Sequence, residues 1–147
     1  MSDEVSVTIT RQDRYRFVLD FGPDIAKTVA DEPAPIGDGA GPSPSQLLAA
    51  AVGSCLSASL LFAQGKFKED PENLTTMVIC QVGRNENNRL RVTGINVTIT
   101  LGVVPKSLDH LERALMQFED FCTVSQSVRT GIPFAVTVMS PDGRVLK

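Results

Sequence analysis

The stretch LLAAAVGSCLSASLL, from Leu47 to Leu61, contains one cysteine, Cys55, among alanine, leucine and serine residues and no charged side chain. Such a run predicts a helix that is apolar on nearly every side. Three interpretations of Cys55 follow from this position. It is a small buried apolar residue, part of a membrane segment, or a thiol that is held in place to react.

The predicted helix begins at Pro44 or Ser45, because proline is tolerated in a first turn and Ser43 is a favourable N-cap. It ends near Gly65, and residues 47–65 alone would be roughly 28 Å long, enough to cross a bilayer. Polar residues within the run and the lack of a lysine or arginine just upstream oppose a membrane span. These polar residues are Ser54, Ser57, Ser59 and Gln64. We therefore expect the central helix of a soluble fold, covered by other elements, and no membrane partner.

The length and composition predict a single soluble domain over residues 1–147. The chain has 42% hydrophobic residues, enough for a core, and a net charge of −3. It lacks the basic stripe that a nucleic acid would need, so we expect no nucleic-acid partner. The N-terminal sequence MSDEVSVTIT is acidic and lacks the features of a secretory signal. We therefore expect a cytoplasmic protein whose three cysteines are free or redox-active thiols.

Alternating apolar and polar residues predict two hairpins. Residues 5–9 and 15–21 alternate on either side of RQDR and form the first hairpin. The segment from Gly22 to Pro44 is rich in glycine and proline and has room for one short strand near Lys27–Ala30. The second hairpin joins Met77–Val82 to Arg91–Leu101 through the turn GRNENNR.

The C-terminal third predicts two more helices and a last strand. Leu108, Leu111, Leu115 and Phe118 recur at helical spacing, with Ser107 as a candidate N-cap and Asp109 and Glu112 in the first turn. A short helix follows over Thr123–Thr130 and ends at Gly131, and IPFAVTVM, residues 132–139, is the last strand. Hairpins combined with grouped helices indicate an α+β fold.

The two cysteines near helices differ in chemistry. Cys122 lies where one predicted helix ends and another begins, and the N–H groups at a helix N-terminus favour a thiolate. Cys55 lies in the middle of an apolar helix, where burial raises the pKa of a thiol. Cys55 therefore needs an arginine or lysine beside it in order to react.

Other interpretations of the cysteines and the single histidine have less support. Cys80 lies in an apolar strand and His110 on a solvated helix, which is typical of structural residues. Cys55, Cys80, Cys122 and His110 are suitable ligand types for zinc, but no two of them have the close spacing of zinc sites. Nothing in the sequence favours a Cys-His hydrolase, so we expect no metal and no such dyad.

The segments GPSPSQLLAAAVGSCLSASLLFAQGK and EDFCTVSQSVRTGIPFAVTV resemble the two cysteine motifs of the OsmC/Ohr family. The resemblance covers nearly the whole chain, including the N-terminal hairpin and the order of elements. It implies an OsmC-like fold in which antiparallel sheets wrap around two long central helices of an intertwined homodimer.

The resemblance also implies thiol-dependent reduction of organic hydroperoxides or hydrogen peroxide. Cys55 would attack the peroxide and become a sulfenic acid, and Cys122 would then form a disulfide with it. A dithiol, often a lipoyl group in this family, would reduce the disulfide. No cofactor is required. The alternative is a weak or inert relative that binds a small apolar ligand at the dimer interface.

Family members support the first cysteine with an arginine from the N-terminal hairpin and a glutamate just upstream of the cysteine. Here RQDRYR offers Arg11, Arg14 and Arg16, and we expect Arg14 and Arg16 to lie on opposite faces if the strand begins there. Ser45 and Gln46 occupy the glutamate positions, and neither carries a charge. Asp31 or Glu32 are the candidate replacements; without one, the resemblance implies a loosely held cation and a weak peroxidase.

Overall fold

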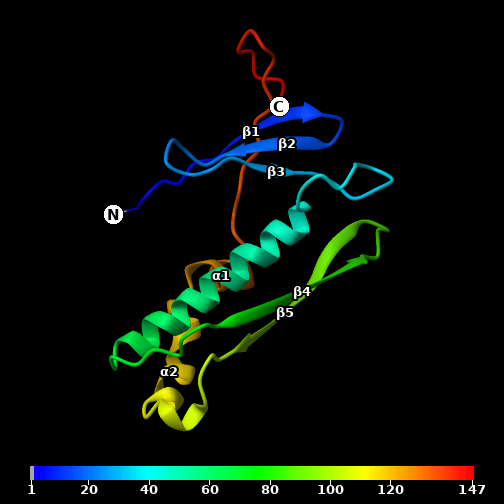
Figure 1. Cartoon of the computed structure of the whole chain (residues 1–147). Coiled ribbons are helices and arrows are strands. Elements are labelled where there is room, and N and C mark those ends of the chain that lie inside the picture. Colours follow the sequence, from blue (N-terminus) through cyan, green and yellow to red (C-terminus); the bar gives the residue numbers. More distant parts are fainter. Residues whose placement is uncertain (1) are drawn as a thin grey trace.

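The computed structural model describes residues 2–147 and has an α+β fold, as predicted (Figure 1). In chain order the elements are β1 (Thr8–Asp13), β2 (Arg16–Asp20), β3 (Thr28–Ala30), α1 (Pro44–Gly65), β4 (Thr75–Arg84), β5 (Leu90–Thr100), η1 (Pro105–Ser107), α2 (Leu111–Gln117), η2 (Phe118–Phe121) and α3 (Thr123–Thr130). Strands β1, β2 and β3 form one antiparallel sheet, and β4 and β5 form another.

Helix α1 begins with a capping box. The Ser43 hydroxyl accepts a hydrogen bond from the N–H of Gln46, and the Gln46 side chain accepts one from the N–H of Ser43. Two backbone donors at the start of the helix are thereby satisfied. The helix is long and apolar enough to cross a membrane by length and composition alone, and 33% of its apolar window is buried within the chain.

The chain covers only one face of α1, whereas the sequence predicts cover on all sides. Val52, Leu56, Leu60 and Ala63 face the core. The opposite face carries Ala50, Ala51, Ser54, Ala58, Leu61 and Phe62, all of which are exposed. Helix α1 therefore has an uncharged face that residues 2–147 of the same chain leave exposed.

Strand β4 packs closely on α1. The Ser57 and Thr76 hydroxyls lie 2.6 Å apart and share a hydrogen bond. Gly53 faces Val78 so closely that a Cβ atom at position 53 would lie 2.5 Å from a Val78 methyl group. A glycine at this position therefore allows the helix and the strand to approach each other.

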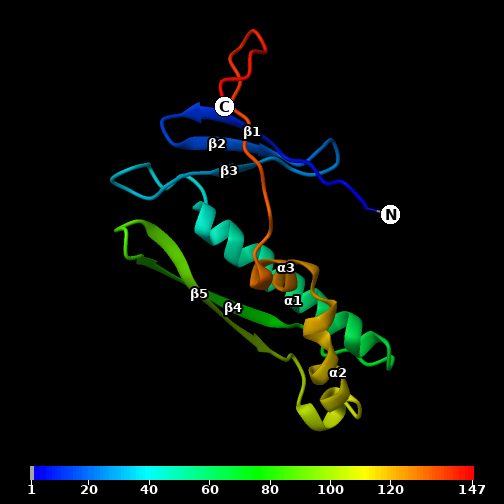
Figure 2. The same ribbon diagram turned by 180° about the vertical axis from the view of Figure 1, so that it is seen from behind.

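The β1–β2–β3 sheet lies beyond the N-terminal end of α1, separated from the β4–β5 sheet (Figures 1 and 2). Within residues 2–147, each of its strands packs mainly on its neighbours in the sheet. All residues of β1 are exposed. This sheet therefore has little share in the core of its own chain.

The C-terminal segment differs from the prediction. Residues 132–139 form no strand; within the described chain, their one β-bridge joins Met139 to Val145. The apolar side chains of this segment are exposed, with Phe134 at 87%. A strand needs a neighbouring strand for its hydrogen bonds, and this segment runs from α3 towards the first sheet without pairing with it (Figure 2).

The second helix begins later than predicted. It starts at Leu111, after a 3₁₀ turn over Pro105–Ser107, so Ser107 is not its N-cap. His110 occupies that position, and its N–H donates to Glu69 Oε1 at 3.0 Å. A carboxylate from a distant loop therefore binds the N-cap residue of α2, and no side chain of the described residues caps the first turn.

Candidate functional site

The structure places Cys55 and Cys122 together. Cys55 lies on α1, Cys122 lies at the N-cap of α3, and both helices pack side by side (Figure 2). Val52, Leu56 and Cys122 form a buried cluster, and Cys55 packs against it. Both cysteines are free thiols. Two motifs that are distant in the sequence therefore meet at one position in the core.

Cys122 is fully buried and is bound by the start of α3. Its exposed fraction is 0%, and its sulfur accepts a hydrogen bond from the N–H of Ser125 at 3.4 Å. Burial alone would raise the pKa of Cys122. Hydrogen bonds from Ser125, the Cys55 thiol and Ser59 outweigh burial and lower this pKa below its ordinary value.

Cys55 is partly exposed, and its pKa changes in the opposite direction. Burial raises the pKa of Cys55, and the neighbouring Cys122 raises it further. The N–H groups of Val124 and Thr123, at the start of α3, oppose this increase but do not cancel it. In this pair Cys122 therefore ionises before Cys55.

No arginine or lysine within residues 2–147 is among the groups that shift the pKa of Cys55. The cation that the sequence requires beside this thiol is thus not supplied within the described chain. The candidate arginines lie elsewhere, beside the loop that precedes α1.

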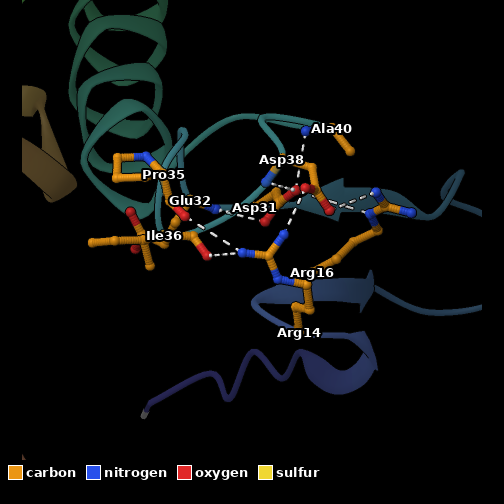
Figure 3. Close-up of polar contacts among 8 residues, drawn as sticks. All are labelled: Arg14, Arg16, Asp31, Glu32, Pro35, Ile36, Asp38 and Ala40. Carbon is orange, nitrogen blue, oxygen red and sulfur yellow. Dashed lines mark hydrogen bonds and ion pairs between the residues drawn. The ribbon is translucent and has the colours of Figure 1, made fainter.

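Arg14 and Arg16 both reach Asp38 (Figure 3). Arg14 Nη1 lies 2.8 Å from Asp38 Oδ1, and Arg16 Nη2 lies 3.5 Å from Asp38 Oδ2. Strand β2 begins at Arg16, while Arg14 has a φ of 42° in the preceding turn. The opposite-face prediction is therefore wrong, because residues two apart in a strand share a face and because Arg14 belongs to the turn rather than to the strand.

The two guanidinium groups are held to different extents. Arg14 also donates to the carbonyl oxygens of Ile36 at 2.9 Å and Pro35 at 3.4 Å. Arg16 has only the long contacts with Asp38 and with Asp31, at 3.9 Å, and its buried Nε has no hydrogen-bond partner within residues 2–147. Arg14 is thus an anchor of the loop, and Arg16 is the less constrained cation.

Asp31 organises the loop that carries Asp38. Its carboxylate accepts hydrogen bonds from the N–H groups of Glu32 at 2.8 Å, Asp38 at 3.2 Å and Ala40 at 3.1 Å. The bonds from Ala40, Asp38 and Glu32 outweigh desolvation and lower the pKa of Asp31. Asp31 is therefore an ionised partner of Arg16.

The remaining candidates of this group have other contacts. The Glu32 carboxylate makes no hydrogen bond or ion pair with residues 2–147. Arg11 Nε donates to the carbonyl oxygen of Arg14 at 2.8 Å and so closes the hairpin turn. Asp38 was not identified by sequence reasoning. Asp38 lies between two glycines, in GDG, which is typical of a turn. This pattern was the sequence feature that could have indicated Asp38.

Ser45 and Gln46 lie in the first turn of α1, and Gln46 belongs to the capping box. Nine residues separate Gln46 from Cys55, which corresponds to about 14 Å along a helix. A side chain at either position therefore does not reach Cys55 of the same chain.

Cys80 and His110 lie away from the thiol pair. Cys80 is half-buried on β4. His110 Nδ1 lies 2.6 Å from Glu69 Oε1, and its ring stacks on Phe67 with the centroids 4.5 Å apart. Residues 2–147 contain no group of three or more side chains that could hold a metal ion. Sequence reasoning also missed Glu69, whose contact with His110 joins positions 41 residues apart.

Two apolar grooves adjoin the thiol pair between β5 and the helices. Their volumes are about 580 Å³ and 550 Å³, and both are lined by Leu56, Ile95, Val97 and Arg129. Ser125 lines the first groove, but neither Cys55 nor Cys122 lines either groove. Arg129 is paired with Glu119 at 3.2 Å. The site therefore combines two adjacent thiols with an apolar surface.

Comparison with solved structures finds the same fold. An OsmC-like protein of unknown function from Vibrio cholerae has a TM-score of 0.69 at 19% identity, over 86% of this chain and 94% of that one. The organic hydroperoxide resistance protein OhrB of Bacillus subtilis has a TM-score of 0.63 at 16% identity, over 86% and 91%. An organic hydroperoxide resistance protein OsmC from Legionella pneumophila has a TM-score of 0.63 at 14% identity, over 86% and 90%.

No curated protein matches the sequence significantly. A family model described as OsmC-like protein matches residues 37–137, which include α1, both helices of the C-terminal third and both cysteines of the pair. The match covers more than half of the chain. The protein therefore belongs to the OsmC-like family.

Proposed function

We propose that the protein is a thiol-dependent peroxidase that reduces organic hydroperoxides through Cys55 and Cys122. The observation that carries the proposal is the contact between a partly exposed thiol and a fully buried one. A hydroperoxide reaches Cys55 from outside, and Cys122 is already in place to form a disulfide. The names of solved neighbours, which include organic hydroperoxide resistance proteins, support this class of reaction.

The reaction proceeds in two steps on the protein. The Cys55 thiolate attacks the terminal peroxide oxygen and the O–O bond breaks, which leaves a Cys55 sulfenic acid. The departing alkoxide takes up a proton and becomes an alcohol. The Cys122 thiolate then attacks the Cys55 sulfur, and the sulfenic oxygen leaves as water after it takes up a proton. The lowered pKa of Cys122 supports this second step, because the attacking group is the thiolate.

The first step requires a cation beside Cys55. We propose that a second copy of the chain supplies this cation. The exposed apolar face of α1, the separate N-terminal sheet and the exposed residues 132–137, which form no strand, are surfaces that a partner copy would cover. Arg16 is the favoured cation because its contacts with Asp31 and Asp38 are long. A guanidinium beside Cys55 would lower its pKa and stabilise the charge on the leaving oxygen.

The proposal also includes the location of the protein in the cell, its oligomeric state and its reductant. The peroxidase would act as a cytoplasmic homodimer, without a membrane or nucleic acid as a partner. A dithiol, such as a lipoyl group on another protein, would return the disulfide to thiols.

Mass spectrometry after addition of one equivalent of cumene hydroperoxide tests the proposal. We expect the loss of two hydrogen atoms, mapped to Cys55 and Cys122, and turnover when a dithiol is added. Cys55→Ser should abolish consumption of the hydroperoxide, and Cys80→Ser, a half-buried cysteine outside the pair, should leave it unchanged. Unchanged consumption by the Cys55→Ser variant would remove Cys55 from the mechanism.

A second candidate function is binding of a small apolar ligand without turnover. The two apolar grooves favour it, as does the raised pKa of Cys55. In that case both thiols persist after treatment with the hydroperoxide, and no hydroperoxide is consumed in the presence of a dithiol. The same mass measurement therefore separates the two functions.

A further inference from the structure

We infer that the reducing dithiol attacks the sulfur of Cys55, and that Cys122 is the thiol that leaves. This inference rests on the proposed function, because it concerns the Cys55–Cys122 disulfide that the peroxidase would form. It assigns different roles to two sulfurs that are chemically equivalent in a disulfide.

Access to the two sulfurs differs. A thiolate that attacks a disulfide approaches one sulfur from the side opposite to the other sulfur, so the attacked sulfur must be reachable from outside. Cys122 is fully buried and lies in a cluster with Val52 and Leu56. Cys55 is only partly buried. The protein interior therefore blocks an approach to Cys122 and leaves Cys55 as the open sulfur.

The leaving sulfur is stabilised by the start of α3. The Ser125 N–H donates to the Cys122 sulfur at 3.4 Å, and this sulfur occupies the N-cap position of an eight-residue helix. A thiolate at this place gains both the hydrogen bond and the positive end of the helix dipole. The lowered pKa of Cys122 has the same cause, and a thiol of lower pKa leaves faster.

The exchange then balances in two steps. A thiolate of the dithiol bonds to the Cys55 sulfur, the Cys55–Cys122 bond breaks, and Cys122 leaves with the electron pair. The second thiol of the reductant loses its proton and attacks the reductant sulfur of the mixed disulfide. Cys55 leaves as a thiolate, and the reductant becomes a cyclic disulfide. Two electrons pass from the dithiol to the protein.

A single-thiol probe makes the attacked sulfur visible, because it cannot carry out the second step. The full-length protein with Cys80→Ser is oxidised to the disulfide, mixed with glutathione, quenched in acid within the reaction time and digested at low pH. We expect glutathione on the peptide that contains Cys55, in roughly tenfold or greater excess over the Cys122 peptide. Equal labelling, or labelling mainly on Cys122, would overturn the inference.

The choice of oxidant distinguishes a failure of this inference from a failure of the proposed function. Diamide forms disulfides without any peroxidase activity, so the test is run on protein oxidised with diamide and on protein oxidised with cumene hydroperoxide. If only diamide forms the disulfide, the peroxidase proposal fails and the attacked sulfur is still identified. If neither oxidant joins the two cysteines, both proposals are wrong.

Discussion

The backbone N–H of Ser125 donates a hydrogen bond to the sulfur of Cys122 at 3.4 Å. The bond links the first turn of α3 to the buried member of the thiol pair. Because hydrogen bonds to the sulfur outweigh burial and lower the pKa of Cys122, the start of α3 favours ionisation of the buried thiol.

Ser125→Ala should slow reduction of the disulfide by a dithiol modestly, because loss of the hydroxyl makes the leaving thiol more basic while the backbone N–H that binds the Cys122 sulfur remains. The effect on the first reaction with hydroperoxide should be smaller, since Cys55 carries out that step. Stopped-flow measurement of each half-reaction separates the two rates. Ser127→Ala, on the same helix, is the matched control. A loss confined to the hydroperoxide step would contradict this role of Ser125.

Gly53→Ala should reduce the free energy of unfolding by about 1–3 kcal/mol, the usual cost of overpacking. The added Cβ would lie 2.5 Å from a methyl group of Val78, which is a stiff β-branched side chain. Alanine favours a helix over glycine by about 1 kcal/mol, so the observed effect is the difference of two terms.

Chemical denaturation measures this effect, with Ser54→Ala on the exposed side of α1 as the control. Addition of Val78→Ala to Gly53→Ala should recover part of the loss through the contact between these two positions. If the effects of Gly53→Ala and Val78→Ala on the free energy of unfolding are fully additive, the close approach of these two positions does not limit packing.

Arg16→Ala should slow the reaction of Cys55 with hydroperoxide and raise the pH at which this reaction reaches its maximum rate. If a partner copy supplies the cation, a stricter prediction follows for mixed dimers. In mixed dimers of Arg16→Ala and Cys55→Ser chains, one site combines an intact Cys55 with an intact Arg16 from the other chain. Random mixing should restore about a quarter of the wild-type activity.

The same mixture distinguishes the source of the arginine. If Arg16 acted on Cys55 of its own chain, no mixed dimer would contain a complete site and activity would stay at the background level. Gln12→Ala, an exposed position on β1, mixed with Cys55→Ser, controls for dilution by the inactive chain.

Glu69→Gln should lower the Tm at neutral pH, because Glu69 links the end of α1 to the start of α2. Burial would raise the pKa of Glu69, but hydrogen bonds from His110 and Gln64 outweigh it and the pKa is lowered. A carboxylate with a lowered pKa stabilises the fold above its ordinary pKa of 4.5, and this contribution disappears as the pH falls through the folded value.

Thermal unfolding between pH 7 and pH 3 checks this behaviour. The difference in Tm between wild type and Glu69→Gln should be largest near neutral pH and should shrink below about pH 4.5, the ordinary value of this carboxyl. Glu112→Gln, exposed on α2, should show no such trend. A difference that stays constant down to pH 3 would show that the charge of Glu69 has no part in the effect.

Local patterns predicted most of the elements. Alternation located both hairpins, although β1 covers Thr8–Asp13 rather than residues 5–9, and Ser43 with Pro44 marked the start of α1. Gly131, with a φ of 76°, ends α3 as predicted. These features depend on neighbouring residues in the chain, so the sequence contains the necessary information. The predicted start of α2 was wrong because Ser107 belongs to a preceding 3₁₀ turn, and the N-cap residue, His110, is held by Glu69 from a distant loop.

The sequence by itself determined the α+β class, the apolar central helix and the two cysteine motifs. The tertiary structure decided that Cys55 and Cys122 touch, that Cys122 is the more acidic thiol, and that Arg14 and Arg16 share Asp38. It also left residues 132–139 without a strand partner. Secondary structure follows from interactions between near neighbours, whereas burial, pKa values and ion pairs depend on residues that only folding brings together.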